Sequence, residues 1–115
     1  MNIGIVGSRT YNDYLNAEKE LNNLLKNIEV NNIVSGGAYG ADKIAELYAK
    51  KNNYNLIIHK PDWNKYGKSA GYIRNKLIIN DSDYIIAFWD GESKGTKISI
   101  DLANKENKKL YIKYI

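Results

Sequence analysis

The 115-residue chain contains no cysteine, one histidine (His59), one proline (Pro61) and only two arginines. Without cysteine it forms neither a disulfide framework nor a thiolate metal or redox site, and a zinc site would have to rest on carboxylates and one imidazole. No apolar run is long enough to span a membrane, and Met1 leads directly into an alternating pattern without the basic and apolar regions of a signal peptide. We therefore expect no metal site, no membrane partner and a cytoplasmic location.

The length predicts a single domain over residues 1–115. Domains cluster near this size, and a chain with 43% hydrophobic residues buries enough surface to form a core without disulfides or metals.

The net charge of +4 comes from a surplus of lysine, which supplies 15 of the 17 basic residues. The lysines form no dense block, so we interpret most of them as solvated surface, and the composition argues against a nucleic-acid partner. Arg9 and Arg74 stand out, because a chain that favours lysine uses arginine where a planar, bidentate donor is needed, as in phosphate or carboxylate recognition.

Apolar segments predict five strands, at residues 2–7, 32–35, 54–59, 84–89 and 110–114. Helical spacing predicts four helices between them. The first is capped by Asn12 or Asp13 and has an apolar face from Leu15 to Ile28, and the others lie at about 41–51, 70–79 and 96–104. The third helix is expected from the helical spacing of its apolar residues Ile73, Leu77 and Ile78. A polar and aromatic loop is expected at 61–68.

Alternation of strands and helices predicts parallel strand pairing with right-handed crossovers. The expected fold is a three-layer, Rossmann-like α/β sandwich with a five-stranded parallel sheet and helices on both faces. Ligands of such sheets bind at the carboxyl ends of the strands where the strand order reverses, which for the order 3-2-1-4-5 lies between the first and fourth strands.

Four segments follow strands and carry the candidate ligand-binding residues. These residues are Gly7, Ser8, Arg9, Ser35, Gly36, Gly37, Ala38, Asp42, Trp63, Tyr66, Lys68, Arg74, Asn75, Asp90, Gly91, Ser93, Gly95 and Thr96. Adjacent glycines after a strand let backbone amides approach an anion, and the helix that follows adds N–H groups and partial positive charge. The dinucleotide fingerprint Gly-x-Gly-x-x-Gly is absent, so nicotinamide chemistry is not indicated and no cofactor is expected.

The individual segments suggest different roles. Arg9 is placed to reach a phosphate, and the aromatic rings of Trp63 and Tyr66 to stack on a base. The segment 90–96 forms a phosphate cradle at a helix N-terminus, but it has no Gly-Lys-Thr sequence, so ATP hydrolysis is not indicated. Asp42 is ambiguous: it either stabilises the first turn of a helix or contacts a ribose or another part of a ligand.

Taken in order, these motifs resemble the YspA-like (cpYpsA-related) group of the SLOG superfamily, which includes DprA and the LOG enzymes. The motifs that carry the resemblance are Gly7-Ser8-Arg9, Ser35-Gly36-Gly37-Ala38, Gly40-Ala41-Asp42, Asp62-Trp63, Tyr66-Gly67-Lys68, Ala70-Gly71, Arg74-Asn75, Ala87-Phe88-Trp89-Asp90-Gly91, Ser93 and Gly95-Thr96. The resemblance covers nearly the whole chain. It implies a Rossmann-like nucleotide pocket that serves either ligand sensing or phosphoribohydrolase activity.

LOG enzymes use an arginine on a helix and a glutamate three residues after a Gly-Thr turn. Arg74 resembles that arginine and Gly95-Thr96 that turn, but Ser99 occupies the position of the glutamate. If the chain is an enzyme, its catalytic residues would be Arg74, Asp42 and Asp90, with Glu92 as a further candidate acid.

Three interpretations follow. The first is a module that binds a nucleotide, an ADP-ribose-type or a cyclic signal molecule for sensing or sequestration, with phosphates on the glycine-rich turns and arginines. The second is a LOG-like N-glycosidic hydrolase acting on nucleoside monophosphates or NAD-derived compounds. The third and weakest is a DprA-like single-stranded nucleic-acid binder. A homodimer or higher homo-oligomer is expected on symmetry grounds.

Overall fold

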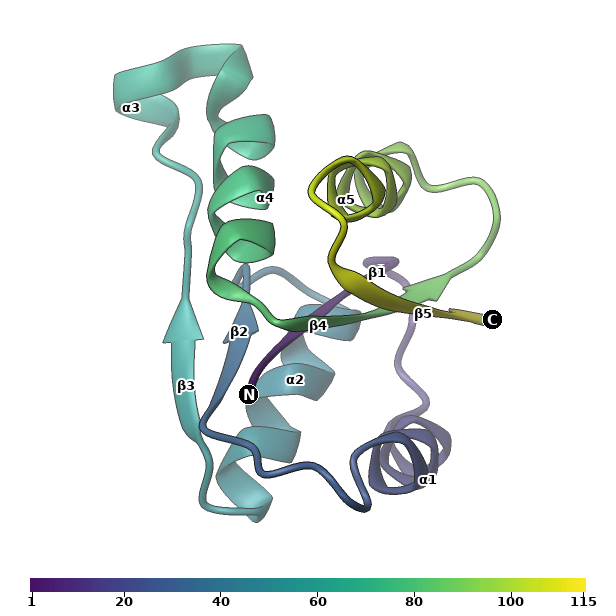
Figure 1. Ribbon diagram of the computed structural model, residues 1–115. Coiled ribbons are helices and arrows are strands. Elements are labelled where there is room, and N and C mark those ends of the chain that lie inside the picture. The colour runs from purple at the N-terminus through teal and green to yellow at the C-terminus, as the bar shows by residue number, and fades with distance from the viewer.

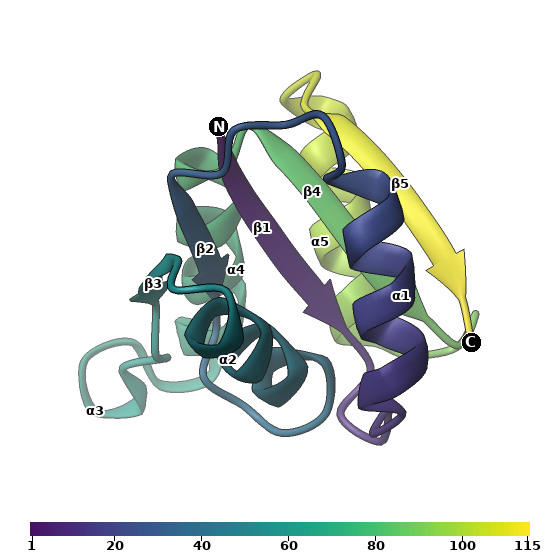
Figure 2. The ribbon, with the colours of Figure 1, turned by 90° about the horizontal axis from the view of Figure 1, so that it is seen from below.

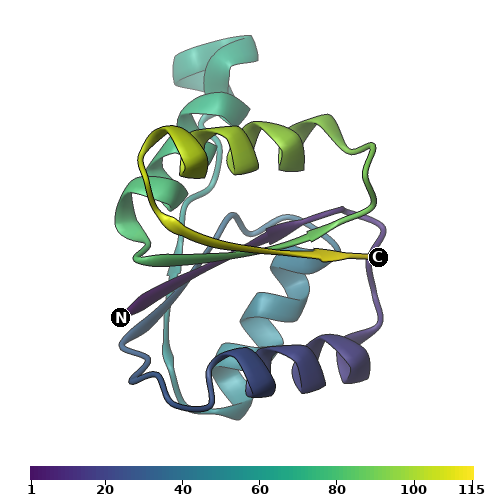
Figure 3. The same ribbon diagram turned by 45° about the vertical axis from the view of Figure 1, so that its right-hand side comes forward.

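The computed structural model describes residues 1–115 and contains five parallel strands and five α-helices (Figure 1). In chain order the elements are β1 (Asn2–Gly7), α1 (Tyr14–Leu24), β2 (Asn32–Ser35), α2 (Ala41–Lys51), β3 (Asn55–Ile58), α3 (Trp63–Tyr66), a 3-10 turn (Gly67–Ser69), α4 (Ala70–Asp81), β4 (Tyr84–Trp89), α5 (Lys94–Lys105) and β5 (Lys109–Tyr114). Helices α1 and α2 cover one face of the sheet, and α4 and α5 cover the other (Figure 3). The predicted three-layer α/β fold is confirmed.

The sheet has the order β3-β2-β1-β4-β5, with every neighbouring pair parallel. Strands β1, β4 and β5 run side by side in one direction (Figure 2). From β1 the chain adds β2 and then β3 on one side, and it then crosses to β4 on the other side of β1. The carboxyl ends of β1 and β4 therefore form the point where the strand order reverses, and a ligand site is expected there.

Alternate residues of β1 enter two separate cores, as the period of a strand requires. Ile3 and Ile5 belong to the core beneath α1 and α2, and Val6 belongs to the core beneath α4 and α5. Strand β4 is buried along nearly its whole length, which explains its continuous apolar sequence.

The local structure differs from the sequence pattern at three places. Leu15 is 76% exposed, because α1 turns Ala17 and Leu21 toward the sheet instead. Leu77 is also exposed, since the apolar residues of α4 surround the helix and their spacing does not identify the buried face. The predicted loop at 61–68 contains helical turns, and Asp62 caps α3 by accepting a hydrogen bond from the Lys65 N–H at 3.1 Å. No helix of the chain combines the length and apolar character needed to cross a membrane.

Candidate functional site

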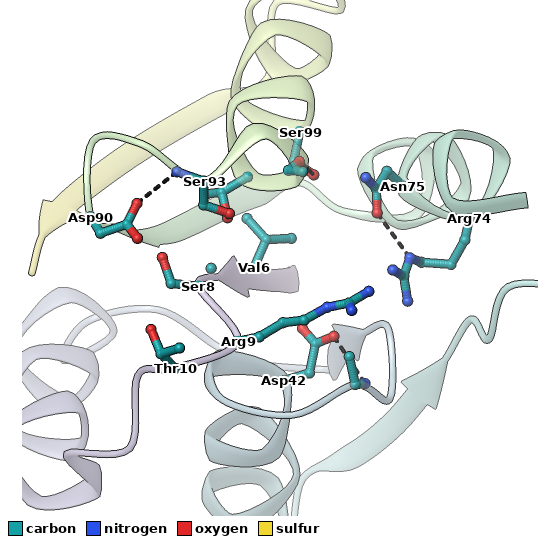
Figure 4. A pocket seen from close by; sticks show the side chains of 14 residues that line it. Val6, Ser8, Arg9, Thr10, Asp42, Arg74, Asn75, Asp90, Ser93 and Ser99 are labelled. Carbon is teal, nitrogen blue, oxygen red and sulfur yellow. Dashed lines mark hydrogen bonds between the residues drawn. The ribbon is translucent and has the colours of Figure 1, made fainter. Parts of the chain in front are cut away.

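A polar cavity of about 350 Å³ opens at the carboxyl ends of β1 and β4 (Figure 4). The residues that line it come from the β1–α1 turn, the turn before α2, α4, and the β4–α5 segment: Val6, Gly7, Ser8, Arg9, Thr10, Ala38, Asp42, Arg74, Asn75, Asp90, Ser93, Gly95, Thr96 and Ser99. It lies where the strand order reverses, and only two of these residues are hydrophobic.

The turn after β1 is held between β4 and α2. The Ser8 N–H donates to the Phe88 carbonyl at 3.0 Å, and the Ser8 carbonyl accepts from the Ala41 N–H at 3.2 Å. Gly40 has a φ of +69°, and a Cβ there would collide with the Ser8 and Arg9 backbone, so this close approach requires glycine. The Ser8 hydroxyl is consequently fixed on the cavity wall. Its residue is 2% exposed, and the hydroxyl has no hydrogen-bond partner in the chain.

The first turn of α5 presents free backbone amides. Asp90 Oδ1 accepts hydrogen bonds from the Glu92 N–H at 2.9 Å and the Ser93 N–H at 2.8 Å, which lower the pKa of this carboxyl. The helical ladder begins only with the Lys97 N–H, which donates to the Ser93 carbonyl at 3.1 Å. The amides of residues 94–96 therefore have no helical acceptor, and Gly95 and Thr96 line the cavity.

On the opposite wall, Arg74 is held by acceptors of the chain itself. Its Nη1 donates to the Gly36 carbonyl and its Nε to Asn75 Oδ1, both at 2.9 Å. Burial lowers the pKa of Arg74, the neighbouring Asp42 opposes this effect, and Arg9 adds to it. Figure 4 shows Arg9 reaching across Asp42 toward Arg74. Two guanidinium groups thus lie near a single buried carboxylate, an excess of positive charge that favours an anionic ligand.

Asp42 occupies the middle of the cavity wall. Its Oδ2 accepts one hydrogen bond from the Ala38 N–H at 3.1 Å. Burial raises the pKa of Asp42 above its ordinary value of 3.8, and the Ala38 N–H and the charge of Arg74 partly offset this increase.

A second hollow of about 400 Å³ adjoins the cavity and shares Arg9, Ala38 and Arg74 with it. Its remaining lining comes from Gly36, Gly37, Lys60, Pro61 and Trp63. The Trp63 ring is 55% exposed, so an aromatic face lies at this end of the site.

The structure brings most of the sequence-predicted residues together. Eleven of them line the cavity: Gly7, Ser8, Arg9, Ala38, Asp42, Arg74, Asn75, Asp90, Ser93, Gly95 and Thr96. Gly36, Gly37 and Trp63 line the adjoining hollow. Ser35, Tyr66, Lys68 and Gly91 line neither, and Ser35 is fully buried with a hydroxyl that has no partner.

The site also contains residues that were not predicted to bind: Val6, Thr10, Lys60, Pro61 and Ser99. The position of Ser99 was readable from the sequence, since it lies four residues after Gly95 and so one helical turn along the same face. No group of three or more histidine, aspartate or glutamate side chains is arranged to hold a metal ion.

Comparison with known protein families identifies the family of this chain. A family model described as "YspA, cpYpsA-related SLOG family" matches residues 1–66. The Gene 61 protein of Mycobacterium phage D29 is 37% identical over 79 residues, which cover 64% of this chain and 63% of that protein.

Two solved structures share the fold. DNA processing protein A from Helicobacter pylori, whose structure concerns its single-stranded DNA binding mode, has a TM-score of 0.74 and 26% identity, covering 97% of this chain and 64% of that chain. DNA processing protein A (DprA) from Streptococcus pneumoniae has a TM-score of 0.78 and 20% identity, covering 96% of this chain and 49% of that chain. The chain thus spans less than two thirds of each of these three proteins.

The Helicobacter similarity contradicts the sequence-based argument against a nucleic-acid partner. A protein with this fold and a related sequence binds single-stranded DNA. The expectation that a nucleic-acid partner is unlikely is therefore wrong as it stands.

Proposed function

Because the chain belongs to the YspA, cpYpsA-related SLOG family, we propose that it binds a nucleotide-derived ligand in the cavity at the carboxyl ends of β1 and β4. One observation carries the proposal. The free amides at the start of α5 lie on the same cavity as the buried Ser8 hydroxyl, which has no partner in the chain. Buried polar groups are normally hydrogen-bonded, so a donor left without an acceptor beside a polar cavity supports an anionic ligand there.

The ligand's phosphate would lie against the first turn of α5. Gly95 leaves room for it, since a Cβ at this position would meet no atom within 4 Å. The Gly95 and Thr96 amides and the Ser8 hydroxyl would donate to the phosphate oxygens, and the partial positive charge of the helix start would add to the attraction. Asp90 also lines the cavity, where its Oδ1 is occupied by two backbone N–H groups and the nearby Ser8 hydroxyl helps to lower its pKa. A bound phosphate would compete with this carboxylate for the Ser8 hydroxyl.

The rest of the ligand would extend toward Arg9 and Arg74. The adjoining hollow shares both arginines with the cavity and ends at Trp63. A guanidinium pair followed by an exposed indole suits a second phosphate or a base that stacks on the ring. A nucleotide, an ADP-ribose-type molecule or a cyclic signal molecule fits this sequence of groups, for sensing or sequestration.

Two buried serines provide a matched test. Ser8→Ala and Ser35→Ala each remove one buried hydroxyl without a partner, but only Ser8 lines the cavity. We expect Ser8→Ala to weaken calorimetric binding of 5′-AMP or ADP-ribose about tenfold or more, because a hydrogen bond to a charged group is lost. Ser35→Ala, which removes a hydroxyl behind Asp42 and not on the cavity surface, should weaken binding much less than Ser8→Ala, and both variants should remain folded. Equal affinity of the two variants, or no binding of any nucleotide by the wild type, would contradict the proposal.

A second candidate function is single-stranded DNA binding, which the Helicobacter neighbour favours because it matches 97% of this chain. The cavity and the adjoining hollow form one path along the sheet edge that a sugar-phosphate backbone could follow. Titration of salt separates the two functions. Binding of an oligonucleotide that contacts several phosphates weakens steeply with salt, whereas binding of one mononucleotide weakens little.

A further inference from the structure

Asp42 is a buried acceptor with unused capacity. Its residue is only 9% exposed, and a carboxylate offers about four acceptor positions, of which the Ala38 N–H occupies one. The Ser35 hydroxyl and the Gly36 N–H lie close enough to help lower its pKa, but burial outweighs all these donors. No salt bridge joins it to Arg74, whose guanidinium donates instead to Gly36 and Asn75. A buried carboxylate whose acceptor positions are not all occupied destabilises the free protein, so hydroxyl groups of a ligand in the cavity would find acceptors on Asp42.

The position of Asp42 in the cavity indicates which groups of a ligand would donate to it. The phosphate site at Ser8 and Gly95 lies on one side of the cavity, and the Trp63 hollow adjoins it beyond Arg9 and Arg74. Figure 4 shows Asp42 between the Ser8 side and Arg74. In a 5′-nucleotide the ribose lies between the phosphate and the base, so the group opposite Asp42 would be the sugar.

We propose that the Asp42 carboxylate accepts hydrogen bonds from the 2′- and 3′-hydroxyls of the ligand's ribose, so that the site selects ribonucleotides over 2′-deoxyribonucleotides. The inference rests on the proposed nucleotide function. A vicinal diol donates two hydrogen bonds to one carboxylate, whereas 2′-deoxyribose supplies only one of these two donors to the buried Asp42. In a DNA strand the 3′-oxygen carries a phosphodiester, which would place an anion beside Asp42 instead of a donor.

A structural role for Asp42 makes a different prediction. The residue lies in the first turn of α2, where a carboxylate stabilises the helix regardless of ligand. That role would change stability and the affinity for every ligand alike. The ratio of affinities for a ribonucleotide and its 2′-deoxy counterpart would not change.

The test is calorimetric titration of the wild type with the four ribonucleoside 5′-monophosphates and their 2′-deoxy counterparts. We expect the wild type to prefer the ribonucleotide by about tenfold or more. Asp42→Asn, which replaces one acceptor oxygen by a donor, should bring this ratio close to one. Asp101→Asn, which removes an exposed carboxylate on α5 outside the cavity, should leave the ratio unchanged.

The outcomes distinguish the two levels of the proposal. Binding with equal affinity for both sugars in the wild type overturns the role of Asp42 and leaves the proposed function standing. A preference that persists in Asp42→Asn assigns the selection to another residue and also overturns it. No binding of any monophosphate overturns this inference, and it overturns the proposed function as well if ADP-ribose also fails to bind. The wild-type ratio needs no variant, so it remains decisive if Asp42→Asn fails to fold.

Discussion

Replacing Arg74 by alanine should weaken both ligand binding and the fold, because the guanidinium serves the cavity and the chain at once. Its two hydrogen bonds, to Gly36 and Asn75, tie α4 to the turn after β2. An isolated surface arginine contributes little to stability, but Arg74 is half-buried and its charge stabilises the carboxylate of the buried Asp42. Alanine would leave the Gly36 carbonyl without its donor and would remove one of the two guanidinium groups beside Asp42.

The magnitudes follow from these contacts. Loss of a charged donor to a buried carbonyl costs roughly 1.5 to 3 kcal/mol, so we expect the free energy of unfolding to fall by about 2 kcal/mol. For a domain of this length, that loss lowers Tm by roughly 8 °C and leaves the chain folded at room temperature. Affinity for 5′-AMP should fall by about 10- to 100-fold, since a charge-assisted contact to the ligand disappears.

The assay combines thermal unfolding by circular dichroism with calorimetric titration of 5′-AMP well below Tm. Lys76→Ala is the matched control, because it removes one positive charge from an exposed position of the same helix, and it should change neither quantity. Adding Asp42→Asn to Arg74→Ala should recover part of the lost stability, since the buried carboxylate is then absent. Wild-type affinity in a folded Arg74→Ala would refute the role in binding, and wild-type stability would refute the role of the two hydrogen bonds.

Two further predictions concern the α5 turn and Asp42. Gly95→Val should weaken 5′-AMP binding more than Lys94→Ala, because a side chain at 95 crowds the phosphate, although the fold itself has open space there. If calorimetry shows a larger loss of affinity in Lys94→Ala, side chains and not backbone amides form the site. Burial raises the pKa of Asp42 above 3.8, so the folded chain binds this proton more tightly than the unfolded chain does. The stability that the proton contributes is therefore present at acid pH and is lost as the pH rises through the raised pKa. In urea unfolding, the stability of the wild type relative to Asp42→Asn should therefore decrease as the pH rises above the ordinary pKa of an aspartate, about 4, and a constant difference would contradict the pKa shift.

The fold could be predicted because its signals are local and repeated. The apolar run at β4, the alternation along β1 and the helical spacing of α2 each identify an element without tertiary information. Their order along the chain then restricts the sheet to parallel pairing with right-handed crossovers. Spacing failed at Leu15 and Leu77, where apolar residues on several sides of a helix leave the buried face to be decided by packing.

The site could be predicted only as a set of turns. Glycines and polar residues after each strand indicate which segments meet at the carboxyl edge, and eleven of the predicted residues do line one cavity. Their individual states depend on contacts distant in sequence. Ser8 is buried because Phe88 and Ala41 hold its backbone, and Arg74 is engaged because Gly36, 38 residues earlier, lies within reach of its guanidinium. Neither contact can be predicted from the neighbouring sequence.

Turnover is the last property that the geometry constrains, and we expect the chain to release little or no free base from 5′-AMP or ADP-ribose. Ser99, at the position of the LOG glutamate, is buried and its hydroxyl lies 3.4 Å from the Gly95 carbonyl. A neutral hydroxyl neither stabilises an oxocarbenium-like sugar nor activates water as a carboxylate does, and a positioned acid or base contributes about 10² to 10⁴-fold to such a rate.

The two carboxylates that line the cavity determine how this expectation could fail. Asp42 has a raised pKa and Asp90 a lowered one, and groups whose pKa values are shifted apart can divide the roles of acid and stabilising anion. The measurement is chromatography of free adenine and ribose phosphate after long incubation with each compound. Multiple turnovers that disappear in both Asp42→Asn and Asp90→Asn would show that these two residues replace the missing glutamate, and the chain would then be a hydrolase whose binding site is the one described above.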